Sequence, residues 1–142
     1  MKRIWLTLAI MLSLVGATFP ALAQSPELMA AYRQSKALHA QGKYAEAEPF
    51  ARKALELGKV EFGPDHPSVA TSLNNLAVLY RAQGRYGEAE PLYKRSLAIW
   101  EKSLGPEHPY VATPLNNLAE LLKSQGSYAE ARPLYERSLA IG

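Results

Sequence analysis

The chain has 142 residues, a length that fits one domain and disfavours a multidomain enzyme. It contains no cysteine, which excludes disulfide frameworks, cysteine-ligated metal centres and thiol nucleophiles. Lys and Arg number 16 against 13 Asp and Glu, and the isoelectric point near 9.2 raises the question of a nucleic-acid partner. With 48% hydrophobic and 20% charged residues, the composition is that of a globular chain.

The N-terminal segment 1–23 has the pattern of a secretory signal peptide. Two basic residues precede an apolar stretch over 4–15, and Ala21-Leu22-Ala23 forms an A-x-A cleavage site before Gln24. A retained membrane anchor is the alternative, but Gly and Pro interrupt the run before the roughly 20 apolar residues that a span needs. We therefore predict export from a bacterial cell, to the periplasm or outside, with no membrane span after cleavage.

Cleavage changes the charge argument. Removing the two basic residues of the leader leaves a nearly neutral chain over 24–142, without a Lys/Arg cluster. Nucleic acid is therefore not expected as a partner. Basic residues instead lie near acidic ones, as Lys94 lies four positions after Glu90.

The remaining chain contains an internal repeat with an offset of 42 residues. The segment GPDHPSVAT from Gly63 matches GPEHPYVAT from Gly105, and the motif LNNLA follows in both copies. A period of 20–50 residues is typical of solenoids, in which each unit buries its apolar face by stacking on the next. We predict an all-α, right-handed solenoid of three antiparallel helix pairs in one domain, 24–142. Its units are about 25–62, 63–104 and 105–142.

Each unit is predicted to contain two helices joined by a tight turn. In the second unit these span about 67–83 and 87–104, with apolar residues at helical spacing. Gly84 lies between them and can supply the positive φ of a helix terminus. A tyrosine follows the turn in every unit, and we expect all three to be core residues; they are Tyr44, Tyr86 and Tyr128.

The histidines do not form a catalytic or metal-binding motif. His66 and His108 occupy the same position of the G-P-x-H-P segment, one repeat apart, and are predicted to cap the helix that follows. The sequence lacks an H-x-x-x-H pair, a G-x-S-x-G elbow and a phosphate-binding glycine loop. Neither enzymatic activity, a cofactor nor a metal site is predicted.

The residues of the second unit carry a family resemblance. The spacing of Leu76-Ala77, Tyr80, Gly84, Tyr86 and Ala89 resembles the tetratricopeptide repeat. The 42-residue period and the phrases HPSVATSLNNLAVLY and YGEAEPLYKRSLAI are similar to its longer, kinesin light chain-like form. The resemblance implies a helical-repeat scaffold that binds a peptide or protein in a concave groove lined by the first helix of each pair.

The same resemblance implies which residues face this groove. Asn74 and Asn116 are the leading candidates, because an amide side chain can bond both polar groups of a peptide backbone. Asn75 and Asn117 are expected to tie repeats together, although Asn74 and Asn116 could equally do so. The other candidates are Thr71, Arg81, Thr113, Lys123, Tyr32 and His39, together with Met29, Lys36, Val78 and Glu120. Trp100 has no aromatic counterpart in the other units and is either a contact residue or the product of drift.

Departures from the repeat leave further alternatives open. Pro114 lies inside a predicted helix and requires that the helix starts late or kinks. A polar capping helix does not follow the third unit, so we expect Leu134, Leu139 and Ile141 to stay partly exposed. That end is then either a surface for self-association or the edge of a longer array. A regulatory fragment of a secreted enzyme system is a third alternative.

Overall fold

The computed structural model describes residues 25–141, and over these residues the chain forms six helices and no strand. The predicted signal segment lies outside the described residues. The helices are α2 (Pro26–Ala40), α3 (Tyr44–Phe62), α4 (Pro67–Ala82), α5 (Tyr86–Leu104), α6 (Pro109–Ser124) and α7 (Tyr128–Ile141). The predicted all-α helical-repeat fold is confirmed.

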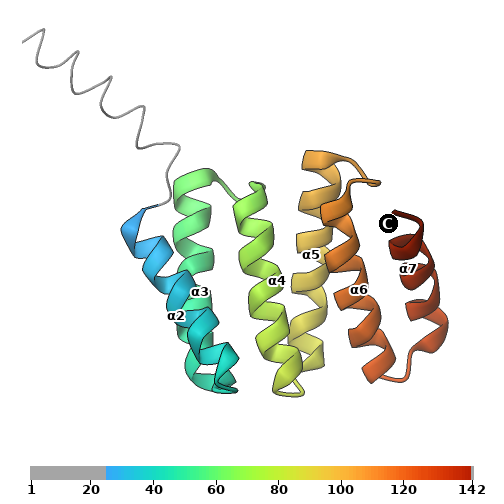
Figure 1. Ribbon diagram of the computed structural model, residues 1–142, viewed down its shortest axis with the longest axis horizontal. Helices are drawn as coiled ribbons and strands as arrows, with labels where there is room; N and C mark the ends of the chain where they lie inside the picture. Colours follow the sequence, from blue (N-terminus) through green and yellow to red (C-terminus); the bar gives the residue numbers. More distant parts are fainter. Residues whose placement is uncertain (1–24, 142) are drawn as a thin grey trace, which may run out of the picture.

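The six helices form three consecutive antiparallel pairs (Figure 1). The first helices of the pairs, α2, α4 and α6, lie on one side of the array, and we call the surface that they form the A face. The turn within each pair contains a glycine with a positive φ, such as Gly84 at 74°. This conformation is favourable for glycine because it has no Cβ, and it reverses the chain sharply after the first helix.

The first helix of each pair begins at a side-chain cap. Ser25 Oγ accepts a hydrogen bond from the Leu28 amide at 3.2 Å. His66 Nδ1 accepts from the Ser68 amide at 3.1 Å, and His108 Nδ1 accepts from the Tyr110 amide at 3.2 Å. A proline follows each cap at the first helical position, where the missing amide hydrogen costs nothing. The predicted capping role of the two histidines is confirmed.

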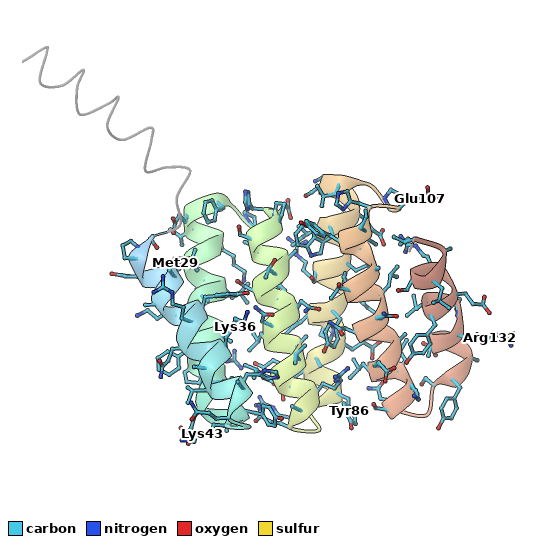
Figure 2. The ribbon with its side chains drawn as sticks, viewed as in Figure 1. Met29, Lys36, Lys43, Tyr86, Glu107 and Arg132 are labelled. Carbon is cyan, nitrogen blue, oxygen red and sulfur yellow. The ribbon has the colours of Figure 1, made fainter. Side chains whose placement is uncertain are left out.

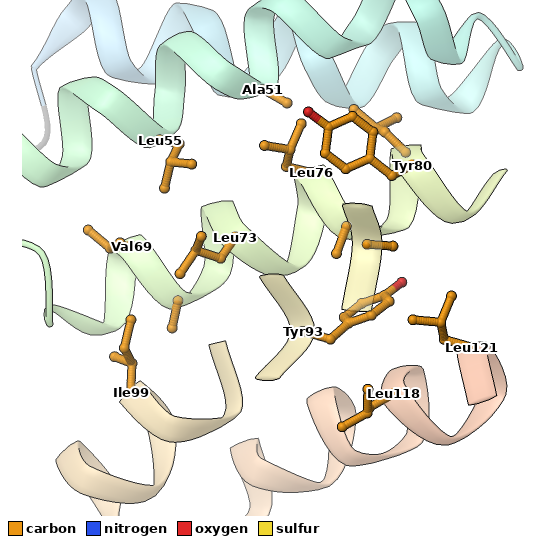
Figure 3. Packing of buried hydrophobic residues seen from close by; sticks show 14 of the residues in the cluster. Ala51, Leu55, Val69, Leu73, Leu76, Tyr80, Tyr93, Ile99, Leu118 and Leu121 are labelled. Atoms are coloured by element: carbon orange, nitrogen blue, oxygen red, sulfur yellow. The ribbon is translucent and has the colours of Figure 1, made fainter. Parts of the chain in front are cut away.

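The apolar faces of the helices meet in a continuous core that runs through the three pairs (Figure 3). In α4, the residues predicted from helical spacing are buried, including Val69, Leu73 and Leu76. Small residues such as Ala77 and Ala89 are completely buried and allow neighbouring helix backbones to approach closely. Stacking of the pairs thus replaces the single compact core of a non-repetitive domain.

Polar side chains also hold neighbouring pairs together. Arg85, in the turn between α4 and α5, pairs with Glu48 of α3 at 2.7 Å and stacks on Tyr80 at 4.3 Å from the ring centre. Burial would raise the pKa of Glu48, but hydrogen bonds from Arg52 and Arg85 outweigh it and keep this pKa below its ordinary value. Further along the array, Arg137 of α7 pairs with Glu101 of α5 at 2.9 Å.

One expectation from the sequence is wrong, and an alternative that it left open is decided. Tyr128 is 67% exposed, whereas Tyr44 and Tyr86 are partly buried against the core. Tyr128 begins the last helix of the described residues, where no later helix covers it. For Pro114 the sequence left two alternatives open, a late start of the helix or a kink, and the late start does not occur, because α6 begins at Pro109, in register with Pro67 of α4. Pro114 is therefore accommodated, fully buried, within α6.

The end of the described array exposes apolar side chains, as expected. Leu139 is 80% exposed, and Leu134 and Ile141 are partly buried. Among the helices of residues 25–141, none is both long enough and apolar enough to cross a membrane.

Candidate functional site on the A face

Two hollows on the A face occupy equivalent positions in successive repeats. The first lies between α2 and α4 above α3, and the second lies between α4 and α6 above α5; their volumes are about 210 and 280 Å³. Figure 2 shows this face with its side chains, with Met29 and Lys36 labelled on α2. The first hollow is lined by Leu28, Met29, Tyr32, Gly58, Ser68, Thr71 and Ser72. The second is lined by Thr71, Asn74, Trp100, Tyr110, Thr113 and Pro114.

Six of the seven residues that line the first hollow, all except Leu28, have a counterpart at the repeat offset in the second hollow, but the chemistry of the two linings differs. Small residues line the first, which we call the small-residue hollow, at Gly58, Ser68 and Ser72. At the same repeat positions the second, which we call the aromatic hollow, has Trp100, Tyr110 and Pro114. Both hollows share Thr71 on α4, so they adjoin each other along the A face.

Two aromatic rings form the walls of the aromatic hollow. The rings of Trp100 and Tyr110 lie 5.6 Å apart with an angle of 69° between their planes. Tyr110 also packs edge-on against His108, at 5.0 Å. Tyr110 is nevertheless 62% exposed, so a large aromatic surface stays accessible at the mouth of the hollow. Exposed aromatic groups beside a cavity are typical of binding surfaces.

Some of the polar groups that line the aromatic hollow already form hydrogen bonds within the protein. Asn74 Oδ1 accepts a hydrogen bond from Asn117 Nδ2 at 2.9 Å, which links α4 to α6. The Thr71 hydroxyl donates to the Pro67 carbonyl at 3.3 Å within α4. Asn74 therefore contacts the next repeat, which is one of the two roles that the sequence left open, and it also lines the aromatic hollow. Asn117 ties repeats together, as expected.

A third hollow lies between the C-terminal halves of α2 and α4. It is lined by Ser35, Lys36, His39, Asn75, Val78 and Leu79. His39 packs against the Tyr44 ring at 5.5 Å, and the Lys36 ammonium lies 5.4 Å from the Tyr32 ring centre. Asn75, which was expected to tie repeats together, lines this hollow.

The remaining predicted groove residues lie outside these hollows. Asn116 and Lys123 are exposed on α6, and Arg81 is partly buried near the end of α4. Glu120 accepts a hydrogen bond from the Tyr135 hydroxyl of α7. Burial and this bond raise the pKa of Tyr135 to about 12. The structure thus brings Thr71, Asn74 and Thr113 together at the aromatic hollow, and it places Tyr32 and His39 along α2.

Sequence reasoning missed the walls of the aromatic hollow. Tyr110 and Pro114 were not singled out as contact residues, and Trp100 remained undecided. A signal for them was present, because all three replace small residues at the equivalent positions of the preceding unit. Within residues 25–141, the structure contains no cluster of three His, Asp or Glu side chains that could hold a metal ion.

The fold and the lined face define the class of this protein as an α-helical repeat scaffold. A tetratricopeptide-repeat family model matches residues 27–102 and 72–142, so the chain belongs to the tetratricopeptide-repeat family. Proteins of this family are generally non-catalytic scaffolds for protein interaction. No curated protein matches the chain.

Several solved structures are similar to the chain. The nearly identical TPR-like repeats of a Podosopora anserina protein assigned as a kinesin light chain superpose with a TM-score of 0.73 at 28% identity, over 83% of this chain and 56% of that one. BtubC (BKLC) from P. vanneervenii gives 0.71 at 28% identity, over 75% and 42%. The TPR domain of Arabidopsis FLU gives 0.73 at 20% identity, over 82% and 95%, which shows the fold alone. The chain spans about half the length of the first two structures.

Proposed function

We propose that this protein is an exported scaffold that binds an extended peptide segment of a partner protein along the A face. The observation that carries the proposal is the row of hollows between successive first helices. Each hollow has a volume of about 210–280 Å³. Sites for drug-sized ligands and cofactors are typically about 300–1,000 Å³, so each hollow suits one side chain of a longer ligand.

The arrangement of the hollows favours an extended ligand over a compact one. The small-residue hollow and the aromatic hollow share Thr71, so one strand of peptide can place side chains in both. Thr71 lines both hollows, Asn74 and Thr113 line the aromatic hollow, and their polar groups can bond to the backbone of the peptide. Export follows from the predicted signal segment, and N-terminal sequencing of the secreted protein tests it: a chain that begins at Gln24 supports cleavage, and a retained leader contradicts it.

The binding test uses the full chain and a library of random decapeptides displayed on phage. We expect selection to enrich peptides and expect the double variant Asn74→Ala, Asn116→Ala to lose their capture while its helical circular dichroism stays unchanged. Asn117→Ala is the matched control, because it breaks the bond to Asn74 without removing the Asn74 side chain. Equal capture by the double variant and the wild type would place the binding surface away from the A face.

Self-association is a second candidate function, favoured by the apolar surface of α7. Leu139 is 80% exposed and Tyr128 is 67% exposed on this helix. Association through α7 predicts a mass in solution that rises with concentration and falls again in the variant Leu139→Lys. A monomer at every concentration would exclude this function.

A further inference from the structure

The last described helix, α7, carries a row of side chains along the side that faces away from the other helices. Its members recur at intervals of four, three and four residues, with one carboxylate beside them, and we call the row the outer stripe: Tyr128, Arg132, Tyr135, Glu136 and Leu139. Residues at this spacing lie on one side of a helix, as in the seam of a coiled coil. The side chains of Arg132 and Glu136 are 81% and 63% exposed, and Figure 2 shows Arg132 pointing away from the array.

The repeat shows that the same positions serve as a packing surface elsewhere in the chain. Two repeats earlier, Tyr128 and Leu139 correspond to Tyr44 and Leu55 of α3. Leu55 is buried and Tyr44 packs against the core, because α4 lies against α3. In Figure 1, α7 lies at the end of the described array, and within residues 25–141 no helix takes the equivalent place beside it. The outer stripe is therefore a helix-packing surface without a partner in this part of the chain.

We propose that the outer stripe packs against the outer stripe of a second copy of the chain, with the two α7 helices antiparallel and related by two-fold symmetry. The inference rests on self-association, the second candidate function above, and specifies its geometry. A two-fold contact uses the same patch on both copies, so the patch has to complement itself. In this pairing Tyr128 lies opposite Leu139 of the second copy, and Arg132 lies opposite Tyr135 of the second copy.

The charges of the outer stripe complement themselves in an antiparallel pair. Arg132 and Glu136 form an ion pair within α7 at 2.9 Å. When the two helices run in opposite directions, the Arg132 of each copy also lies next to the Glu136 of the other, so that four groups of alternating charge surround the two-fold axis. In a parallel pair Arg132 would instead face Arg132, which is unfavourable.

The protein already contains a contact of this kind between two of its own repeats. Arg85 pairs with Glu48 at 2.7 Å and stacks on the ring of Tyr80, 4.3 Å from its centre, across the boundary between the first and second helix pairs. In the proposed dimer Arg132 meets the same two kinds of group, a glutamate and a tyrosine ring, on the second copy.

The other exposed end of the array, α2, does not suit the outer stripe. A second copy that continued the solenoid would place its α2 against α7, as α4 lies against α3. At the positions of the buried Leu76 and Val69 of α4, however, α2 has the exposed polar residues Gln34 and Glu27. Head-to-tail stacking would bury these polar side chains without the apolar contacts that α4 makes.

The charges also disfavour head-to-tail stacking. Lys43 takes the position of Arg85 in the first unit, and Arg132 takes the position of Glu48 in the third unit. Continuing the solenoid with a second copy would therefore bring Lys43 toward Arg132, where the internal boundary has a pair of opposite charges. The two-fold arrangement avoids this repulsion.

The size of the contact predicts a weak dimer. The 14 residues of α7 give a helix about 21 Å long, so one helix from each copy forms an interface at the lower end of the range for specific complexes. We therefore expect the dimer to dissociate on dilution. The A face stays accessible, because no residue of the outer stripe lines the small-residue hollow, the aromatic hollow or the third hollow.

Charge variants of the full chain test the arrangement by sedimentation velocity over a range of concentrations. Arg132→Glu and Glu136→Arg each bring like charges together across the two-fold axis, and each is expected to weaken dimerisation by about tenfold or more. An equimolar mixture of the two variants should dimerise again, because one copy then carries only acidic and the other only basic groups at these positions. Gln34→Arg on α2 is the matched control, with no expected change. Circular dichroism checks that every variant keeps its helical content.

Cysteine cross-linking tests the direction of the helices independently. The chain contains no cysteine, so introduced cysteines report only on their own positions. A mixture of Tyr128→Cys and Leu139→Cys should form a mixed disulfide on oxidation, because the two-fold arrangement places these residues at the same level. Leu139→Cys alone should form little disulfide, because the two copies of this residue lie about 17 Å apart along the helix axis, beyond the roughly 7 Å between Cα atoms that a disulfide spans.

The possible results separate the arrangement from the function on which it rests. Dimerisation that the charge variants leave unchanged, that their mixture does not restore, or that Gln34→Arg weakens would overturn the two-fold arrangement and leave self-association standing. Equal cross-linking by Leu139→Cys alone and by the mixture would do the same. A monomer at every concentration would contradict self-association itself and the inference with it, whereas the peptide-binding proposal is tested by variants on the A face.

Discussion

The hydroxyl group of Tyr93 provides a sharp test of the packing between repeats. Tyr93 of α5 is completely buried, and within the described residues its hydroxyl has no hydrogen-bond partner. Burial raises the pKa of Tyr93 to about 12. A buried, unpaired polar group costs about 1–3 kcal/mol, because it loses its bonds to water on folding. Tyr93→Phe removes this cost and keeps the ring, so we expect it to raise the free energy of unfolding by about 1 kcal/mol.

The repeat supplies a matched control at Tyr135 of α7, one repeat further along. The hydroxyl of Tyr135 donates a hydrogen bond to Glu120. Tyr135→Phe removes a satisfied hydroxyl and leaves the carboxylate without this donor, so it should lower the free energy of unfolding by about 1 kcal/mol. The same chemical change thus has opposite expected signs at two equivalent positions.

Urea unfolding followed by circular dichroism at 222 nm measures both effects. The midpoints of the two variants should move in opposite directions from the wild type, with equal slopes. Destabilisation of about equal size in both variants would show that the Tyr93 hydroxyl is hydrogen-bonded in solution, and the reasoning from burial would fail.

Two further predictions use the same measurement. The pKa values of Tyr93 and Tyr135 are both raised to about 12, against about 10 in an unfolded chain, so the unfolded state releases protons first as pH rises. The stabilisation from these two groups should therefore be fully present below pH 10 and be lost between pH 10 and 12. The fall should be less steep in Tyr93→Phe, and parallel pH profiles of this variant and the wild type would contradict the prediction. Gly58→Ala should stabilise α3 by about 0.5–1 kcal/mol, because alanine loses less backbone entropy than glycine in a helix. The added methyl meets Val69 Cγ2 at 3.7 Å, which is an ordinary contact, so it fits without a clash. A loss of stability would instead show that the site is overpacked.

The helix pairs could be predicted from the sequence because local and periodic signals agree. The turn glycines and the capping histidines recur at one offset, and the apolar residues between them have helical spacing. Such signals depend on residues close in the chain, so they survive without knowledge of the tertiary structure. The exposure of Tyr128 could not be predicted from them, because Tyr128 and Tyr44 begin the same tetrapeptide, Tyr-Ala-Glu-Ala, and differ mainly in their neighbours in space.

The candidate site was less predictable because it depends on contacts between repeats. Thr71, Asn74 and Thr113 were expected on the A face, and they line the aromatic hollow. The bond between Asn117 and Asn74 joins residues 43 positions apart and depends on how α6 packs against α4. Sequence spacing alone does not determine that packing, so it could not show which atoms of Asn74 stay available for a ligand.

The positions at which the repeats differ are more informative about the site than those at which they agree. Gly58, Ser68 and Ser72 become Trp100, Tyr110 and Pro114 at the repeat offset. Trp100 lies on α5, the second helix of its pair, whereas Tyr110 and Pro114 lie at the start and in the middle of α6, the first helix of the next pair. Other changes at the same offset lie elsewhere, such as Val78 to Glu120 and Arg85 to Ser127, whereas these three line one hollow. The framework shared by the repeats does not require these larger side chains, so the aromatic hollow is the first place at which to test for a ligand contact.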